Sequence, residues 1–199
     1  IVVVQDAAYA GLTFDQEKPL SLLSIEGAKD VGIEIHSLSK SFNMTWWRLG
    51  FVAGNSLIVK AFASVKDNND SGQFKAIQYA GACALNHYEI TEKTSNKYSR
   101  RHDILVETLK KLGFNVKKPK ATFYLYVKIP KRIKNGEIFN TAEDFSQYLI
   151  KEKLISTVPW DDEGNFIRLS VTFVAKDEDD EKRVIEEIYS RLKDVEFEF

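Results

Sequence analysis

A lysine and an arginine in the stretch "IEIHSLSKSFNMTWWRLGF" have the types and the spacing to bind a phosphorylated carbonyl compound. Lys40 follows Ser37 and Ser39 in a turn after an apolar run, and Arg48 comes eight residues later. Serine hydroxyls and turn N–H groups together bind anions, and a guanidinium binds phosphate through a bidentate fork. A lysine beside such a phosphate anchor is suited to hold a phosphorylated aldehyde as a Schiff base.

The same Lys-Ser pair has two other interpretations. A phosphate-binding P-loop also contains Lys-Ser, but it needs glycines before the pair, and "HSLSKS" has none. We therefore reject the P-loop. A lysine after a strand is most often a solvated surface residue, and for Lys40 this interpretation stays open on the stretch alone.

Two further features add chemistry of the same kind. Asp6 and Tyr9 lie in "DAAY" just after the first apolar run. A carboxylate beside a pyridine nitrogen keeps it protonated, and a phenol near a ring oxygen stabilises the oxygen anion; a helix cap and a core tyrosine are the ordinary alternatives. Arg168 lies within the apolar stretch "NFIRLSVTF", where its fork is suited to clamp a substrate carboxylate.

The elements that must position these residues follow from the hydrophobic pattern. Short apolar runs typical of buried strands and longer periodic segments typical of helices alternate along the chain. The expected strands are 1–4, 32–36, 48–55, two around the Lys/Pro turn within 114–130, and 164–173. The expected helices are 56–67, a stretch of about 71–112 broken once, 140–154 with Thr141 as its N-cap and Asp144 three residues on, and 177–195.

Composition excludes several classes of protein. The chain has 199 residues and a net charge of -1, which argues against a nucleic-acid-binding surface. No apolar run approaches the roughly 18 residues of a membrane span, and no signal peptide is expected. The single cysteine, Cys83, is expected to be a buried thiol, and a reducing, cytoplasmic compartment follows.

In order and spacing, these residues resemble the class I aminotransferases of pyridoxal-phosphate fold type I. The stretches "SLSKSFNMTWWRLGFVAGN", "KDNNDSGQFKAIQ", "KATFYLYVKIP" and "LISTVPWDDEGNFIRLSVTF" are most similar to LL-diaminopimelate aminotransferases and their aspartate aminotransferase-like relatives. The resemblance implies an α/β fold, made of the C-terminal part of the large cofactor-binding domain in residues 1–105 and a small α/β domain in residues 106–199.

The resemblance also implies a role for each candidate residue. Lys40 would link pyridoxal 5'-phosphate and shuttle the proton between the two substrate carbons, Asp6 would pair with the pyridine nitrogen, and Tyr9 with the ring oxygen. Arg168 would bind the α-carboxylate of the substrate, and no metal ion is implied. The phosphate would be held by Ser37, Ser39 and Arg48.

The implied activity is transfer of an amino group between an amino acid (LL-diaminopimelate, glutamate or aspartate) and a 2-oxo acid, as in lysine biosynthesis, by a cytoplasmic homodimer without nucleic-acid or membrane partners. A lyase or synthase of the same fold, a non-catalytic regulator module and a plain structural domain are the alternatives.

The sequence also departs from the family. It opens on "IVVV" without methionine, and the family's glycine-containing phosphate turn, ring-stacking aromatic and ring-oxygen asparagine are not found. We therefore expect a C-terminal portion of a longer enzyme, with exposed apolar surface and little activity on its own.

Overall fold

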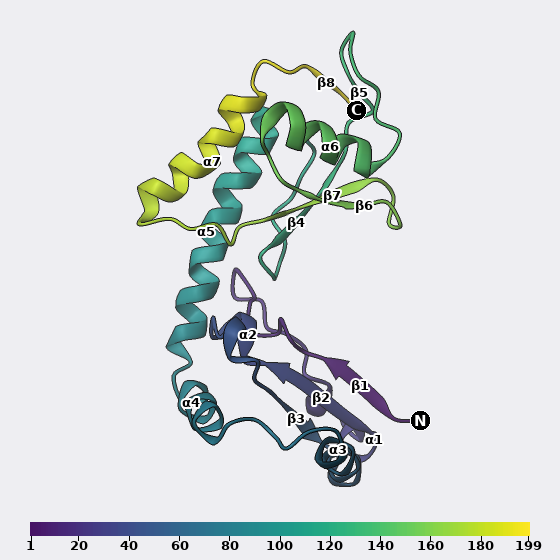
Figure 1. Cartoon of the computed structure of the whole chain (residues 1–199), viewed down its shortest axis with the longest axis vertical. Coiled ribbons are helices and arrows are strands. Elements are labelled where there is room, and N and C mark those ends of the chain that lie inside the picture. Colours follow the sequence, from purple (N-terminus) through teal and green to yellow (C-terminus); the bar gives the residue numbers. More distant parts are fainter. The chain divides into compact units, whose positions relative to one another are not determined.

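The computed structural model describes all 199 residues, and its contacts divide the chain into two units (Figure 1). Unit 1 contains Ile1–Lys97 and Lys120–Thr122, and unit 2 contains Tyr98–Pro119 and Phe123–Phe199. The longest helix, α5 (Glu89–Lys111), has residues in both units. The assignment of a cofactor-binding domain to residues 1–105 and a small domain to 106–199 stays a prediction. No helix combines the length and the apolar character needed to cross a membrane.

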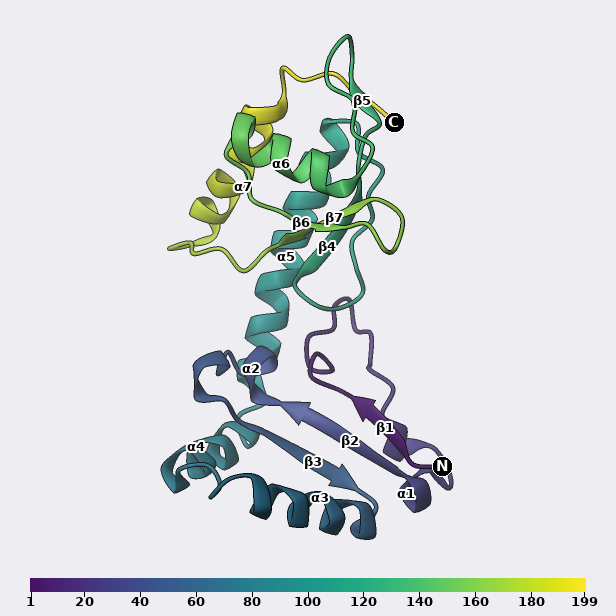
Figure 2. The ribbon, with the colours of Figure 1, turned by 45° about the vertical axis from the view of Figure 1, so that its right-hand side comes forward.

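The sheet of unit 1 has three strands: β1 (Val3–Asp6), β2 (Gly32–Ser37) and β3 (Gly50–Gly54). β1 runs parallel to β2, with Asp6 opposite Ile35, and β3 runs antiparallel to β2, with Gly50 opposite Ser37 (Figure 2). The carboxyl ends of β1 and β2 and the start of β3 therefore meet at one end of the sheet. We call it the carboxyl end of the sheet.

Short helical segments connect these strands: η1 (Leu22–Ser24), α1 (Ala28–Val31), α2 (Leu38–Ser41) and η2 (Thr45–Trp47). Two longer helices, α3 (Ser56–Asn69) and α4 (Lys75–Leu85), follow β3. The chain leaves β3 through Gly54, whose φ is +140° and whose Cα lies so close to the Gly32 carbonyl that a Cβ would clash. Asn55 then caps α3, because its side-chain oxygen accepts hydrogen bonds from the N–H groups of Leu57 and Ile58.

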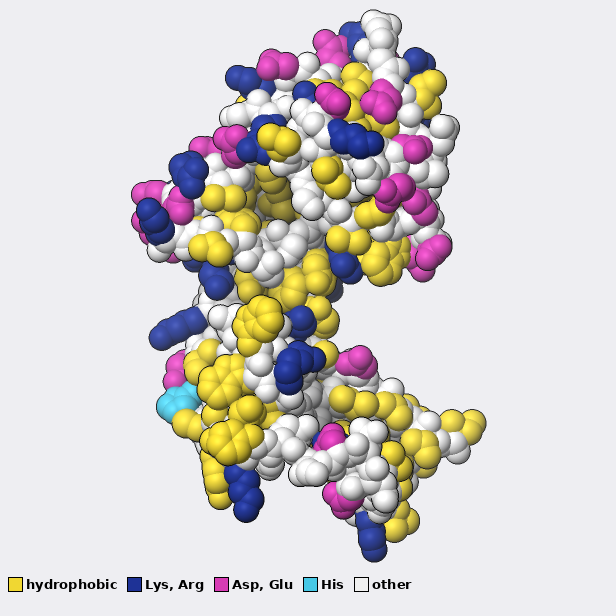
Figure 3. Space-filling view, in the orientation of Figure 1, with side chains coloured by type: hydrophobic (Ala, Val, Ile, Leu, Met, Phe, Trp, Pro, Cys, Tyr) yellow, Lys and Arg dark blue, Asp and Glu magenta, His cyan; other side chains and the backbone are white.

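Unit 1 leaves much apolar surface open, as Figure 3 shows for its yellow side chains. β1 pairs only with β2, so its outer edge has no strand partner. Val2, just before the strand, and Val3 and Val4 within it are 57%, 40% and 52% exposed. The sequence pattern suggested strands buried on both faces, but in this chain the β1 strand is not covered in that way.

The main sheet of unit 2 is antiparallel, in the order β4 (Tyr124–Lys128), β7 (Phe166–Ser170) and β6 (Val158–Trp160). Alternation gives it two different faces. One face carries Leu125, Val127, Ile167 and Leu169, all buried against side chains of α5 and of two further helices, α6 (Ala142–Lys153) and α7 (Glu178–Leu192). A two-stranded sheet of β5 (Arg132–Ile133) and β8 (Phe197–Glu198) completes the unit.

A buried ion pair joins α5 to α7 and to the chain that leaves β7. Arg101 and Glu181 are 3% and 4% exposed, and Arg101 Nε donates to a Glu181 carboxylate oxygen at 2.9 Å. The same guanidinium donates to the carbonyls of Val171 and Phe173 at 2.8 and 2.7 Å. Arg100 binds the other carboxylate oxygen at 2.9 Å. Every oxygen and most donors of this network are therefore paired, as burial of charge requires.

Several sequence predictions are confirmed. The long helical stretch is broken once, between α4 and α5. Thr141 and Asp144 form the expected capping box at the start of α6. The alternation around Arg168 is also confirmed, since Ile167 and Leu169 are buried within β7.

Two predictions are wrong. Of the two strands expected around the Lys/Pro turn within 114–130, only β4 forms, and 114–123 contains no strand. Residues 120–122 bond instead to a distant segment: the Phe14 N–H donates to the Lys120 carbonyl and the Thr122 N–H to the Leu12 carbonyl. Cys83 is exposed rather than buried. In α4 only Gly81 is buried, and Cys83 lies two residues further, on the other side of the helix.

Candidate functional site

The residues predicted to bind a cofactor in unit 1 all follow or precede strands at the carboxyl end of its sheet. Asp6 is the last residue of β1 and Tyr9 lies in the turn after it, while Ser37 is the last residue of β2. Lys40 lies in the short helix α2 that follows β2 directly. Because β1 and β2 are parallel neighbours, these side chains gather at one end, where ligands bind to open α/β sheets.

The "SLSK" turn is fixed by its own hydrogen bonds. The Ser37 hydroxyl caps α2 by accepting a hydrogen bond from the Ser39 N–H at 3.1 Å. Leu38 and Ser39 are buried, whereas Lys40 is half-buried. The Ser39 carbonyl accepts a hydrogen bond from the Thr45 hydroxyl at 2.9 Å. The lysine is therefore held on an anchored turn and can still reach solvent or a ligand.

Lys40 and Tyr9 meet although they are far apart in sequence. The Lys40 ammonium nitrogen lies 5.7 Å from the centroid of the Tyr9 ring, within the range of a cation–π contact. Asp6 and Tyr9 also line an open hollow of about 500 Å³ together with Ala7 and Leu20. Asp6 accepts a hydrogen bond from the Ala8 N–H at 3.1 Å, which leaves its second carboxylate oxygen for a further donor.

Arg48 stands next to the "SLSK" turn. Its backbone is left-handed, with φ of +51°, as it enters β3. The following residue, Leu49, accepts a hydrogen bond from the Leu38 N–H at 3.1 Å, so Arg48 is one residue from direct contact with the turn. Its guanidinium donates to the Thr45 carbonyl at 3.0 Å and is otherwise exposed. The segments that carry these two serines, the lysine and the arginine are therefore neighbours at this corner of the sheet, and hydroxyls and cations are groups that bind an anion.

Arg168 lies in unit 2, on the half-exposed face of the β4–β7–β6 sheet. It is directly opposite Tyr126 on β4 and Val158 on β6. Its guanidinium carbon lies 4.1 Å from the centroid of the Tyr124 ring and 5.1 Å from that of Trp160. Its Nε atom is buried and has no hydrogen-bond acceptor. The structure therefore groups the other predicted residues in unit 1 and places Arg168 in unit 2.

Tyr124 and Trp160 were not singled out from the sequence. The alternation in "FYLYVK" does place Tyr124 and Tyr126 on one face of a strand. That this face is shared with Arg168 depends on which strands pair, and the sequence pattern does not give that pairing.

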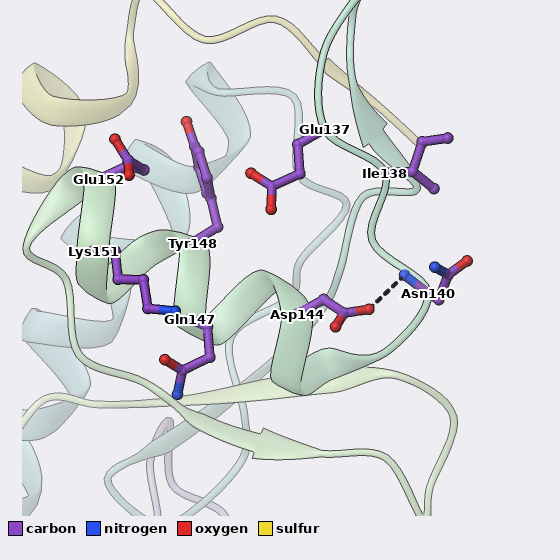
Figure 4. A pocket seen from close by; sticks show the side chains of 8 residues that line it. All are labelled: Glu137, Ile138, Asn140, Asp144, Gln147, Tyr148, Lys151 and Glu152. Carbon is purple, nitrogen blue, oxygen red and sulfur yellow. Dashed lines mark hydrogen bonds between the residues drawn. The ribbon is translucent and has the colours of Figure 1, made fainter.

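A separate hollow of about 390 Å³ lies in unit 2, between α6 and the segment before it (Figure 4). It is lined by Glu137, Asp144, Tyr148, Lys151 and Glu152, among others. Asp144 is committed to the α6 cap. Burial, and then the charges of Glu137 and Glu152, raise the pKa of Tyr148. No predicted site residue lies in this hollow.

Comparisons with known proteins bear on the family and the fold of the chain. The family model for aminotransferase class I and II matches residues 1–188. The chain belongs to this family. The chain is 59% identical over 204 residues to the LL-diaminopimelate aminotransferase of Methanococcus maripaludis, covering 100% of this chain and 49% of that protein. It is 58% identical over 207 residues to that of Methanocaldococcus jannaschii, with the same coverage.

Solved aminotransferase-like structures share the fold. Substrate-bound BacF from Bacillus subtilis superposes with a TM-score of 0.84 at 32% identity, over 100% of this chain and 49% of that chain. An aminotransferase from Staphylococcus aureus gives 0.82 at 30% identity, over 96% and 50%. The chain thus spans about half the length of the relatives it matches. The family and the fold class predicted from the sequence are confirmed.

Aminotransferases of this family depend on pyridoxal phosphate and act on small amino acids and oxo acids, as predicted. The donor set in unit 1 fits this cofactor. Asp6 offers a carboxylate with an oxygen to spare, Tyr9 a phenol beside the lysine, and Lys40 a primary amine on a fixed turn. Ser37, Ser39 and Arg48 offer, at the corner described above, hydroxyl and guanidinium groups of the kinds that suit the cofactor's phosphate.

Proposed function

We propose that this chain carries the lysine-bearing half of a pyridoxal-phosphate aminotransferase that moves an amino group between an amino acid and a 2-oxo acid. The observation that carries the proposal is the position of Lys40 on an anchored turn beside Tyr9, at the same sheet end as Asp6. Two relatives that match the whole chain at 58–59% identity are named LL-diaminopimelate aminotransferases, and we propose LL-diaminopimelate as a substrate. A homodimer and a cytoplasmic location belong to the same proposal.

Each residue has a defined task in this proposal. When bound, pyridoxal phosphate supplies an electron-accepting ring that stabilises negative charge on the substrate's α-carbon. Lys40 Nζ would attach the cofactor and later take and return the proton at that carbon, which general acid–base catalysis requires. Asp6 would keep the pyridine nitrogen protonated, and the Tyr9 hydroxyl would donate to the ring oxygen.

The remaining residues bind rather than react. Ser37, Ser39 and Arg48 would hold the phosphate, which fixes the cofactor against rotation. Arg168 would bind the substrate's α-carboxylate through two parallel hydrogen bonds. Its lack of any acidic partner in the structure supports this role.

The test of the attachment site is chemical. The chain is incubated with pyridoxal phosphate, reduced with borohydride and digested, and the labelled peptide is identified by mass. We expect the cofactor mass on the peptide containing Lys40. Lys40→Ala should abolish this label, while Lys60→Ala, at an exposed lysine of α3, should keep it. A main label on any other lysine would disprove the assignment.

The test of the phosphate corner compares two aldehydes. Wild-type protein should bind pyridoxal phosphate more tightly than pyridoxal, which lacks the phosphate. Arg48→Ala should remove most of that preference, roughly tenfold or more, because it removes a charge-assisted hydrogen bond. An unchanged preference would show that Arg48 does not contact the phosphate.

A further inference from the structure

Arg168 differs from every other arginine of unit 2 in its partners. Arg100 and Arg101 bind Glu181. The other three arginines also have an acidic side chain within 4.0 Å: Arg132 with Glu198, Arg183 with Asp180 and Arg191 with Glu187. Arg168 has no acidic side chain in this range, and its buried Nε, like that of Arg132, has no acceptor. A buried N–H without a partner is unfavourable, so something else must keep this side chain in place.

Two aromatic rings provide the contacts that an acidic side chain provides elsewhere. Tyr124 comes from β4 and Trp160 from β6, the strands on either side of β7. Tyr124 pairs with Ser170, two residues after Arg168, and Trp160 pairs with Phe166, two residues before it. The two rings therefore approach the guanidinium from opposite directions along the strand.

The Trp160 ring is itself held. Tyr126 lies edge-on to it, with ring centroids 5.8 Å apart and an interplanar angle of 87°. Tyr126 and Tyr124 are on the same face of β4, so one strand supports both rings. The rings thus belong to strands of the sheet and not to a loop.

These contacts have a direct consequence for binding. Guanidinium groups are weakly hydrated on their flat faces and stack well on aromatic rings, whereas their N–H donors lie in the plane. Rings against the guanidinium restrict its rotation but use none of its donors. A carboxylate that arrives in the plane then meets donors that are already oriented and unpaired, and less entropy is lost on binding.

We propose that Tyr124 and Trp160 are positioning residues that hold the Arg168 guanidinium ready for a carboxylate. This inference rests on the proposed function in one respect only: the function identifies the carboxylate as that of the substrate. Neither ring needs to touch the substrate, since both act through Arg168.

The experiment uses the 199-residue chain without cofactor and follows the Arg168 Nε–H signal by nitrogen-15 NMR. Propionate is the probe, and propionamide, which has the same shape without the charge, is its control. We expect propionate to shift the Arg168 signal and propionamide to leave it unchanged. Tyr124→Leu and Trp160→Leu should each speed rotation about the Nε–Cζ bond and weaken propionate binding about fivefold, the range of a single cation–π contact.

Conservative and distant variants separate positioning from general damage. Tyr124→Phe and Trp160→Phe keep a ring and should retain both the slow rotation and the affinity. Tyr189→Leu removes an exposed aromatic ring of α7 and should change neither. If the leucine variants leave rotation and affinity unchanged, or if propionate shifts the signal no more than propionamide does, the inference is overturned.

Failure of the inference and failure of the proposed function give different results. Cofactor attachment to Lys40 is read from a different residue, in unit 1, by mass. Loss of that label with a normal propionate response would overturn the function and leave the positioning role. The reverse pattern would overturn only the positioning role.

Discussion

The buried pair of Arg101 and Glu181 gives a stability prediction with a magnitude. Glu181→Gln keeps the shape of the side chain but removes its charge, which leaves two buried or half-buried guanidiniums without their shared carboxylate. Breaking a buried pair by removing one partner costs about 3–5 kcal/mol of unfolding free energy. Because Arg101 keeps its bonds to the carbonyls of Val171 and Phe173, we expect about 3 kcal/mol, the low end.

Removing the arginine instead of the carboxylate should lower the free energy of unfolding further. Arg101→Leu removes the cation together with both carbonyl bonds, and Glu181 then keeps only Arg100. We expect about 4–5 kcal/mol, the upper part of the same range. The double variant Arg101→Leu with Glu181→Leu should lose less than the sum, because no buried charge is left without a partner.

The assay is urea unfolding followed by the fluorescence of Trp160, the tryptophan of unit 2. Trp46 and Trp47, in unit 1, are replaced by phenylalanine in every protein so that only unit 2 is observed. With a slope of about 1–3 kcal/mol per molar urea, the Glu181→Gln midpoint should fall by about 1 M or more.

The control is Arg183→Ala, which breaks an exposed pair with Asp180 on the same helix and should cost under about 1 kcal/mol. If Glu181→Gln costs no more than this control, the reasoning about burial is refuted.

Three further predictions concern other parts of the molecule. Burial raises the pKa of Glu181, but its two arginine partners outweigh this effect, so the pKa lies below its usual value of about 4.5. The stability that this carboxylate contributes is complete above about pH 4.5 and is lost as the pH falls through the lowered pKa. The acid sensitivity of unit 2 should therefore be smaller in Glu181→Gln. Thr141→Ala removes the hydrogen bond to the Asp144 N–H and should cost about 1 kcal/mol in the same urea assay, with no loss in Thr141→Ser. Gly54→Ala forces a side chain into left-handed backbone against the Gly32 carbonyl and should cost about 1–3 kcal/mol, read as a lower melting temperature of unit 1.

Patterns among neighbouring residues predicted those parts of the fold that depend only on neighbouring residues. The capping box of Thr141 and Asp144 and the alternation around Arg168 need only neighbouring residues, and both are confirmed. The family was predicted from the order and spacing of motifs along the sequence, which can be read without the structure. The structure places Asp6 and Lys40 at one sheet end, because Asp6 ends β1 and Lys40 follows its parallel neighbour β2.

Features that depend on distant residues were not predicted. Arg101 and Glu181 are 80 positions apart, and nothing near either residue indicates the other. A strand was expected before the Lys/Pro turn within 114–123, yet none forms there, and part of this segment bonds to residues 12–14. The rings beside Arg168 depend on strand order in the same way.

The unpaired outer edge of β1 has a consequence for handling the protein at high concentration. A strand edge offers free N–H and C=O groups in register, and Val2–Val4 add exposed β-branched side chains without a charge. A second copy can add the free edge of its β3 to this edge, and its own β1 edge then stays open for a further copy. Concentrated solutions should therefore form β-rich assemblies that bind thioflavin, and a lysine in place of Val3 should suppress them by putting like charges side by side.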